Sequence, residues 1–410
     1  MMPGGFMGGA KDRLLPVSVP FRFFGAAAFF HVLAWLTLLL GAGDLPRFIG
    51  GPGPVLAALH LMTLGVLAMA AIGASYQLLP VATRQPLARV WMARLSFWLF
   101  APGLLILALG MSGEADAALW PGAILASAGL LLFAVLTGDN LRRAGSLPIV
   151  AAHGGAALVA LLGTIAAGLL LIGDFSHGYL ADHASVAVLH MGVAAFGFMG
   201  LLVFGYSLIL VPMYLLSRSV PTRPGWLQLG LGVAAILLFA AGRLMALPLL
   251  DVFALLIGLA AAATYLVLMR AAWKSAMRRR QGLSFVLLRA GWAGMVLGLL
   301  TGLVLAAGID IPNGPALFGW IVLVGWLLTF VTGILQRIMP FLASMHATGR
   351  GGKPVRVSDL TAELPLRMHA VGHGLAFVLV ALGIVLDLSV LVQLGAAAGL
   401  AGALAFAAFA

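Results

Sequence analysis

The chain has 410 residues, of which 63% are hydrophobic and only 9% are charged, and its mean hydropathy is +1.13. Soluble proteins carry about 25% charged residues, so this composition excludes an ordinary soluble globular protein. The net charge is +11, and the absence of cysteine excludes disulfides, thiolate catalysis and iron–sulfur clusters.

Apolar stretches of about 20 residues or more recur along the whole chain, and each is long enough to cross a bilayer as a helix. In chain order they lie at 20–42, 53–80, 89–112, 118–138, 148–173, 184–216, 225–247, 251–272, 283–307, 313–343, 365–387 and 390–410. The loops between them are too short to hold a soluble domain. The sequence therefore predicts an all-α polytopic membrane protein with about twelve transmembrane helices in a single domain, 1–410.

The distribution of charge explains the high net charge without nucleic acid. With the N-terminus placed in the cytoplasm, all but two of the 23 Lys and Arg residues fall on the inner side; the exceptions are Arg47 and Arg243. Most of the twelve acidic residues fall outside. This is the positive-inside pattern of membrane proteins. It predicts a bacterial inner-membrane protein with both termini cytoplasmic, whose partner is the lipid bilayer and not nucleic acid.

Three long segments resemble one another at a constant spacing. They begin at His60 (HLMTLGVLAMAAIGASYQLLP), His190 (HMGVAAFGFMGLLVFGYSLILVP) and Trp320 (WIVLVGWLLTFVTGILQRIMP), which are 190 − 60 = 130 and 320 − 190 = 130 residues apart. A repeat of this length sets the architecture. Twelve spans with this period predict three pseudo-equivalent four-helix units, at about 20–138, 148–272 and 283–410.

Histidines within the spans are the candidate functional residues, because imidazole in hydrocarbon is costly unless it is paired or ligated. His60 and His190 lie six or seven residues into spans that run from outside to inside, so their depths match. His31 is near mid-membrane on the first span. His369 and His373 lie one turn apart on the eleventh span, a spacing that can bind a metal.

Packing is the alternative for each of these histidines. A buried His that donates to a backbone carbonyl is common, and a polar packing patch would account for the pair on span eleven. The glycines at 65, 73, 192, 197, 200 and 205 are similarly open to two interpretations: close helix packing, or room for a flat macrocycle.

With a His on span two and another on span six of three four-helix units, the chain resembles the catalytic subunit, subunit I, of the heme–copper oxygen and nitric oxide reductases. The resemblance implies a low-spin heme on His60 and, by position, a copper ligand at His190. The chain departs from the family at span ten, which begins at Trp320 without the two heme ligands, and at span seven, which lacks the copper-binding His pair. Copper therefore has no full ligand set here.

The departures make the chain more similar to divergent relatives that keep the scaffold and some heme ligands, such as the NnrS-type membrane heme proteins linked to nitric oxide stress. Its VPFRFFGAAAFF segment resembles their PFRPFF start. The resemblance implies heme b, held by His60, His190 or both, with His31 as the next candidate for an opposite ligand. Arg243, near the outer end of span seven, is the candidate partner of a heme propionate, and snorkelling to the interface is its alternative role.

These observations predict a membrane heme protein that works in electron transfer, or in binding of or response to nitric oxide or another small gas, without an oxygen-reducing copper centre. If it is an enzyme, it is a heme-dependent oxidoreductase, with respiratory or cytochrome subunits as partners. Two alternatives remain: a non-catalytic subunit or assembly factor of a respiratory complex, and a membrane transporter, since internal repeats also mark transporters.

Overall fold

The computed structural model describes residues 15–145, 147–277, 281–349 and 355–410, and these residues form helices and loops without a strand. Among them are twelve helices long and apolar enough to cross a membrane. The predicted all-α polytopic membrane fold is thus confirmed. Several basic residues that the sequence assigns to the inner side lie outside the described residues: Lys11, Arg13, Arg278, Arg279, Arg280, Arg350 and Lys353.

Nine of the twelve spans are single helices or a helix with one short 3₁₀ turn before it. They are α1 (Ser18–Leu40), α4 (Val90–Met111), η4 with α5 (Asp116–Ala118 and Leu119–Arg142), α6 (Pro148–His177), α9 (Thr222–Leu244), α10 (Pro248–Lys274), α11 (Leu283–Ala306), α14 (Glu363–Val385) and α15 (Ser389–Phe409).

The other three spans, the second, sixth and tenth, each contain a π-helical segment between two α-helices. They are α2–η3–α3 (Pro54–His60, Leu61–Ala68, Met69–Thr83), α7–η5–α8 (His183–Gly192, Val193–Gly200, Leu201–Leu215) and α12–η6–α13 (Gly314–Trp320, Ile321–Leu328, Thr329–Gly349). These are the three spans that contain the sequence repeat. π-Helical segments are rare and often lie near functional sites. Here all three units have one, so the π-helix is a property of the repeat itself.

The π segments and the helix-interior prolines fix the register of the repeat. Pro80, Pro212 and Pro340 each lie 19 residues after the start of their π segment (80 − 61, 212 − 193 and 340 − 321). The second unit is therefore offset by two residues from the constant spacing of 130. His60 and Trp320 both directly precede a π segment, whereas His190 lies two residues before the equivalent position.

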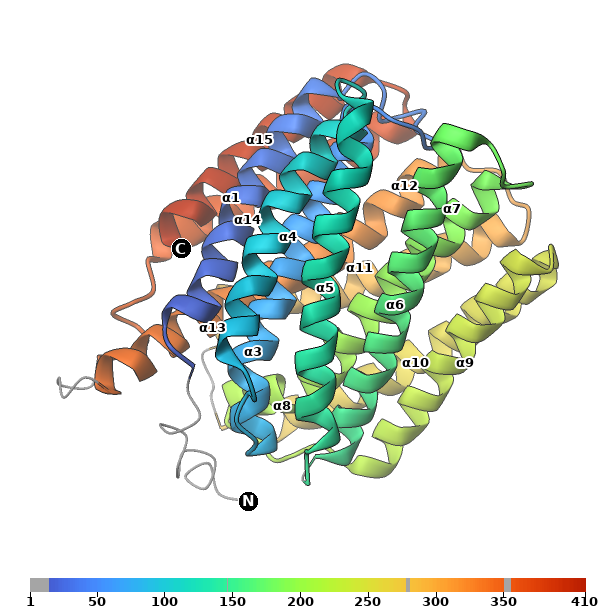
Figure 1. Cartoon of the computed structure of the whole chain (residues 1–410). Helices are drawn as coiled ribbons and strands as arrows, with labels where there is room; N and C mark the ends of the chain where they lie inside the picture. Colours follow the sequence, from blue (N-terminus) through green and yellow to red (C-terminus); the bar gives the residue numbers. More distant parts are fainter. Residues whose placement is uncertain (1–14, 146, 278–280, 350–354) are drawn as a thin grey trace.

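Packing groups the spans into three arcs, each ending in one of the π-containing spans. In the first arc, α14 packs on α15, α15 on α1, and α1 on η3 and α3. In the second, α4 packs on α5, α5 on α6, and α6 on η5 and α8. In the third, α9 packs on α10, α10 on α11, and α11 on η6 and α13. Figure 1 shows α15, α1 and α14 side by side although they come from opposite ends of the chain. Each packing arc thus begins two spans before the corresponding repeat unit predicted from the sequence, at 20–138, 148–272 and 283–410. Those sequence boundaries remain a prediction about how the chain was duplicated.

The six glycines that the sequence left open between packing and macrocycle space are packing positions. A Cβ atom on Gly65 would lie 2.6 Å from Phe30, and one on Gly73 would lie 2.9 Å from Phe24. The same space beside the other four is filled by neighbouring side chains: Phe239 at Gly192, Ala160 at Gly197, Trp326 at Gly200 and His153 at Gly205. Small residues let these helices approach closely, as is usual in membrane bundles.

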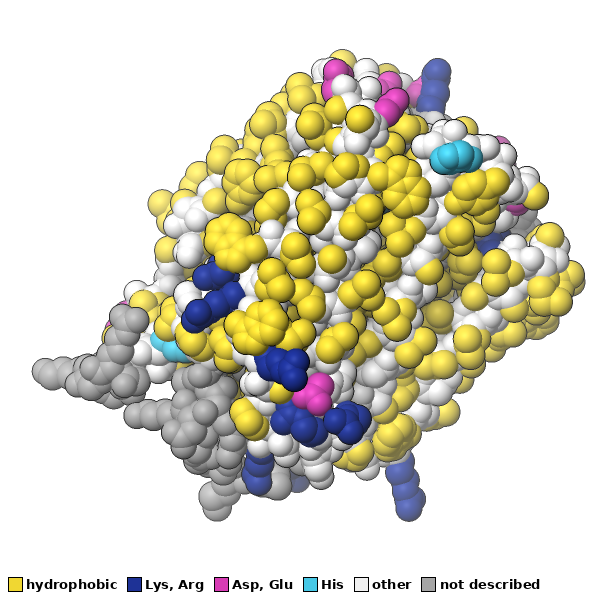
Figure 2. All heavy atoms as spheres, viewed as in Figure 1, with side chains coloured by type: hydrophobic (Ala, Val, Ile, Leu, Met, Phe, Trp, Pro, Cys, Tyr) yellow, Lys and Arg dark blue, Asp and Glu magenta, His cyan; other side chains and the backbone are white. Residues whose placement is uncertain are grey.

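The surface separates lipid-facing and polar regions. Figure 2 shows hydrophobic side chains over the middle of the bundle, with Lys and Arg mostly gathered near one end of this face and Asp and Glu mostly near the other. Large apolar side chains such as Trp98, Val159 and Val267 are exposed on the membrane-spanning helices. This is the surface that a bilayer requires, and it establishes a multi-pass membrane protein.

Candidate functional site

The structure divides the five candidate histidines into two separate groups. His60, at the end of α2, lies beside His190 on α7. His31 on α1 lies instead beside His369 on α14, because its ring faces α14 and α15. His31 therefore does not lie opposite His60 in this structure.

The two rings of the first pair are nearly parallel. Their centroids are 6.3 Å apart and their planes make an angle of 24°. The His60 Nδ1 lies 3.0 Å from the carbonyl oxygen of Leu56, and the His190 Nδ1 lies 3.0 Å from that of Thr164. A carbonyl can only accept, so each Nδ1 carries the proton and donates it. Each neutral ring then has its lone pair on Nε2.

This arrangement matches what two metal-bound imidazoles require. A ligating His commonly donates its other ring nitrogen to a backbone carbonyl, which fixes the tautomer and the ring orientation. Two Nε2–metal bonds of about 2 Å, plus the distance from each nitrogen to its ring centre, give a centroid separation of about 6 Å. The observed 6.3 Å agrees with it. The ring separation and the tautomer therefore agree with two imidazoles that would hold one metal centre between their Nε2 atoms.

The two-residue offset of the second unit explains how these rings meet. Two residues along an α-helix turn a side chain by about 200° and move it about 3 Å. At the position strictly equivalent to His60, the second unit has Gly192, which packs against Phe239. The third unit has Trp320, whose Nε1 donates to the carbonyl of Phe377 at 3.1 Å. Only the first two units therefore contribute an imidazole.

Gly168 on α6 is a residue of this site that the sequence did not indicate. A Cβ atom there would lie 3.1 Å from Cε1 of His190 and 3.6 Å from its Nδ1. Four residues earlier on the same helix, Thr164 supplies the carbonyl that accepts from this ring. One face of α6 thus seats and orients His190. No sequence signal marks it, since both residues lie in an ordinary apolar helix.

Arg243, the predicted propionate partner, forms an ion pair with Asp251 across the turn between α9 and α10. Asp251 is 3% exposed. The guanidinium also lies 5.8 Å from the ring centre of Phe239, and that ring packs against Gly192, two residues after His190. Arg243 is therefore close to the helix that carries His190, but a carboxylate of the protein already neutralises it.

The N-terminal end of α7 is stabilised by Asp182. Its Oδ1 accepts the backbone N–H of Ser185 at 2.9 Å, an N-terminal cap, and the Ser185 side chain also bonds to the carboxylate. These hydrogen bonds lower the pKa of the Asp182 carboxyl below its ordinary value. The cap lies eight residues before His190 on the same helix.

The second group consists of His31, His369 and His373, all buried between α1, α14 and α15. Ring centroids are 5.7 Å apart between His31 and His369, and 5.7 Å apart between His369 and His373. The Nε2 of His373 lies 2.7 Å from the hydroxyl of Thr329. Both nitrogens of His31, both of His369 and Nδ1 of His373 have no hydrogen-bond partner. In the described part of the chain, no three His, Asp or Glu residues are arranged to hold a metal ion.

Three of the four remaining histidines are hydrogen-bonded within the protein. His153 bonds to the carbonyl of Ile149 and to Gln228, His177 to the carbonyl of Gly173, and His183 to the carboxylate of Asp174. The ring of His153 is thus satisfied by contacts within the protein.

Comparison with known proteins does not assign the chain to a family. No protein-family model matches the chain, and no curated protein matches it.

Proposed function

We propose that the protein is a membrane heme protein in which His60 and His190 would together hold one heme b. Its fold would be that of the heme–copper oxidase subunit I superfamily, most similar to its NnrS-type relatives. The single observation that supports this is the pair of nearly parallel imidazoles 6.3 Å apart, each with Nδ1 donating to a backbone carbonyl.

A bound heme b would supply one-electron redox chemistry or binding of a small gas. The residues of this chain would hold it in place. Leu56 and Thr164 fix the tautomer of the two ligands through their carbonyls, and Gly168 leaves room for the His190 ring. Electron transfer would use both His60 and His190 to hold the group, whereas binding of a small gas would use only one of them.

The role we propose is electron transfer, or nitric oxide binding or response, in a bacterial inner membrane with both termini cytoplasmic. The positive-inside pattern supports that orientation. Oxygen reduction at a copper centre is not proposed, because span seven, which holds the copper-binding His pair in those reductases, contains no histidine here. Respiratory or cytochrome subunits are the proposed partners.

Absorption spectroscopy of the purified full-length protein tests the proposal. We expect a Soret band, a pyridine hemochrome of heme b and the sharp reduced bands of a six-coordinate low-spin heme. His60→Ala and His190→Ala should each lower heme content at least about tenfold or yield a five-coordinate heme. His177→Ala is the matched control, since His177 bonds only to a carbonyl of its own helix.

The absence of a Soret band after expression with excess heme would overturn the proposal. It would favour the transporter or the non-catalytic subunit, which need no heme. Wild-type spectra in both His variants, with normal heme content, would instead show that the heme is held elsewhere.

A further inference from the structure

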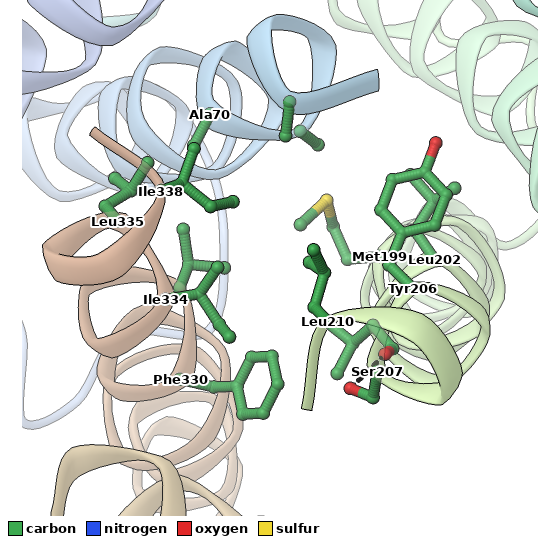
Figure 3. Close-up of a pocket in the computed structure, with 14 residues that line it drawn as sticks. Ala70, Met199, Leu202, Tyr206, Ser207, Leu210, Phe330, Ile334, Leu335 and Ile338 are labelled. Carbon is green, nitrogen blue, oxygen red and sulfur yellow. Dashed lines mark hydrogen bonds between the residues drawn. The ribbon is translucent and has the colours of Figure 1, made fainter. Parts of the chain in front are cut away.

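A cavity lies where the three π-containing spans meet. It is bounded by α3, α8 and α13, which belong to the three most buried of the twelve spans. Its volume is about 60 Å³. Figure 3 shows the side chains of Ala70, Ile334 and Leu210 directed toward the common space from the three helices.

The cavity exists because the first and third units differ at three equivalent positions. Ala70, Ala71 and Ala74 line it from α3. The residues 260 positions later, Phe330, Val331 and Ile334, line it from α13. Three small residues thus stand where the third unit has three large ones. These alanines leave more room than the third-unit side chains would.

The lining cannot hold water well. Two of its side chains have a hydroxyl, and both are already bonded to the protein. The Tyr206 hydroxyl lies 2.6 Å from Oγ of Ser75. The Ser207 hydroxyl donates to the carbonyl of Val203 at 2.6 Å and accepts from the Tyr265 hydroxyl at 2.9 Å. A buried water needs two to four polar partners, and apolar cavities without them stay dry and take up apolar atoms.

The volume restricts the occupant to a very small molecule. Pockets for drug-sized ligands measure about 300–1,000 Å³, so a heme, a quinone ring or a folded lipid chain does not fit. We propose that this cavity binds a small uncharged apolar molecule, of the size of a diatomic gas or a xenon atom, between α3, α8 and α13.

The cavity lies on the same span as His60, the proposed heme ligand. Ala70 follows His60 by ten residues on the same span, so the cavity lies about 15 Å along the helix axis from the proposed heme ligand. An apolar gas dissolved in the bilayer would be concentrated at this point of the bundle, close to the His60–His190 pair. The inference goes beyond the proposed heme site and does not depend on heme, because the cavity lining contains none of the candidate ligands.

Xenon is the probe. In crystals of the full-length protein pressurised with xenon, we expect an anomalous peak between Ala74 and Ile334. Ala74→Ile installs the residue that the third unit has at the equivalent position, fills the space, and should lower xenon occupancy at least about fivefold. The matched control is Ala263→Ile on α10, which faces outward and is exposed, so it should leave the peak unchanged.

A thermal melt shows whether Ala74→Ile folds; if it does not, Ala71→Val makes the same test with one fewer methylene. The proposal is overturned if pressurised wild-type crystals show no xenon peak here, if ordered water or continuous lipid-chain density fills the cavity, or if the folded cavity-filling variant keeps wild-type xenon occupancy. Heme spectra are recorded separately, so failure here and failure of the heme assignment are distinguishable.

Discussion

The His60–His190 pair and the His31–His369–His373 group are both made of imidazoles within the bundle, and they differ in their hydrogen bonds. In the pair, each Nδ1 donates to a carbonyl and each Nε2 is left to bind a ligand. In the group of three, five of the six ring nitrogens have no partner. A ligand site is therefore recognised by oriented rings with one open nitrogen each, and not by the number of histidines that gather.

Displacing the His190 ring should have the largest effect. Gly168→Leu places a side chain where a Cβ atom alone would lie 3.1 Å from Cε1 of His190. We expect at least about a tenfold loss of bound heme or conversion to a five-coordinate spectrum. The control is Gly155→Leu on the same helix, where a Cβ atom would meet nothing within 4 Å. Equal heme spectra in the two variants would show that the face of α6 at Gly168 does not position His190 for heme binding.

Breaking the ion pair of Arg243 should destabilise the fold at the turn between α9 and α10. Arg243→Gln leaves the buried Asp251 carboxylate without its partner, at a cost of about 3 kcal/mol of unfolding free energy. Arg243→Gln combined with Asp251→Asn should recover most of that loss in a thermal melt. If Arg243 also holds a heme propionate, the heme reduction potential of the double variant should still differ from that of the wild type. A wild-type potential in the double variant would show that Arg243 serves the ion pair alone.

Removing one unpartnered imidazole separates the two kinds of histidine group. His369→Leu replaces a buried ring that makes no hydrogen bond with an apolar side chain, so stability should rise by about 1–2 kcal/mol while heme content stays constant. The measurement is the melting temperature together with the metal content of the purified protein. A fall in melting temperature with loss of a bound metal would instead confirm the predicted metal role of His369 and His373.

The smallest effect is expected from the α7 cap. The pKa of Asp182 is lowered in the folded protein, so its contribution to stability is present at neutral pH and is lost as the pH falls below about 4. Asp182→Ala should remove this acid-side dependence of the melting temperature and slightly loosen α7. A pH profile identical to that of the wild type would show that the cap contributes nothing measurable.

Much of the architecture follows from the sequence. Apolar length alone predicts the twelve spans, because a bilayer requires about 20 residues for each helix. The spacing of the repeat predicts that the second, sixth and tenth spans are equivalent. Each of these three spans contains a π-helical segment, which local propensity does not reveal. Glycine was ambiguous in the sequence, because the same residue type permits close packing or leaves space, and only the neighbouring Phe, Trp and His side chains decide between them.

By itself, the sequence determined the membrane class, the span count, the repeat and the set of candidate histidines. The tertiary structure decided their partners: it brought His190 to His60, separated His31 from both, and paired Arg243 with Asp251. The physical reason is that depth depends on position along one helix, whereas contact depends on the rotation and packing of two. An offset of two residues changes a depth by about 3 Å but turns a side chain to another side of its helix.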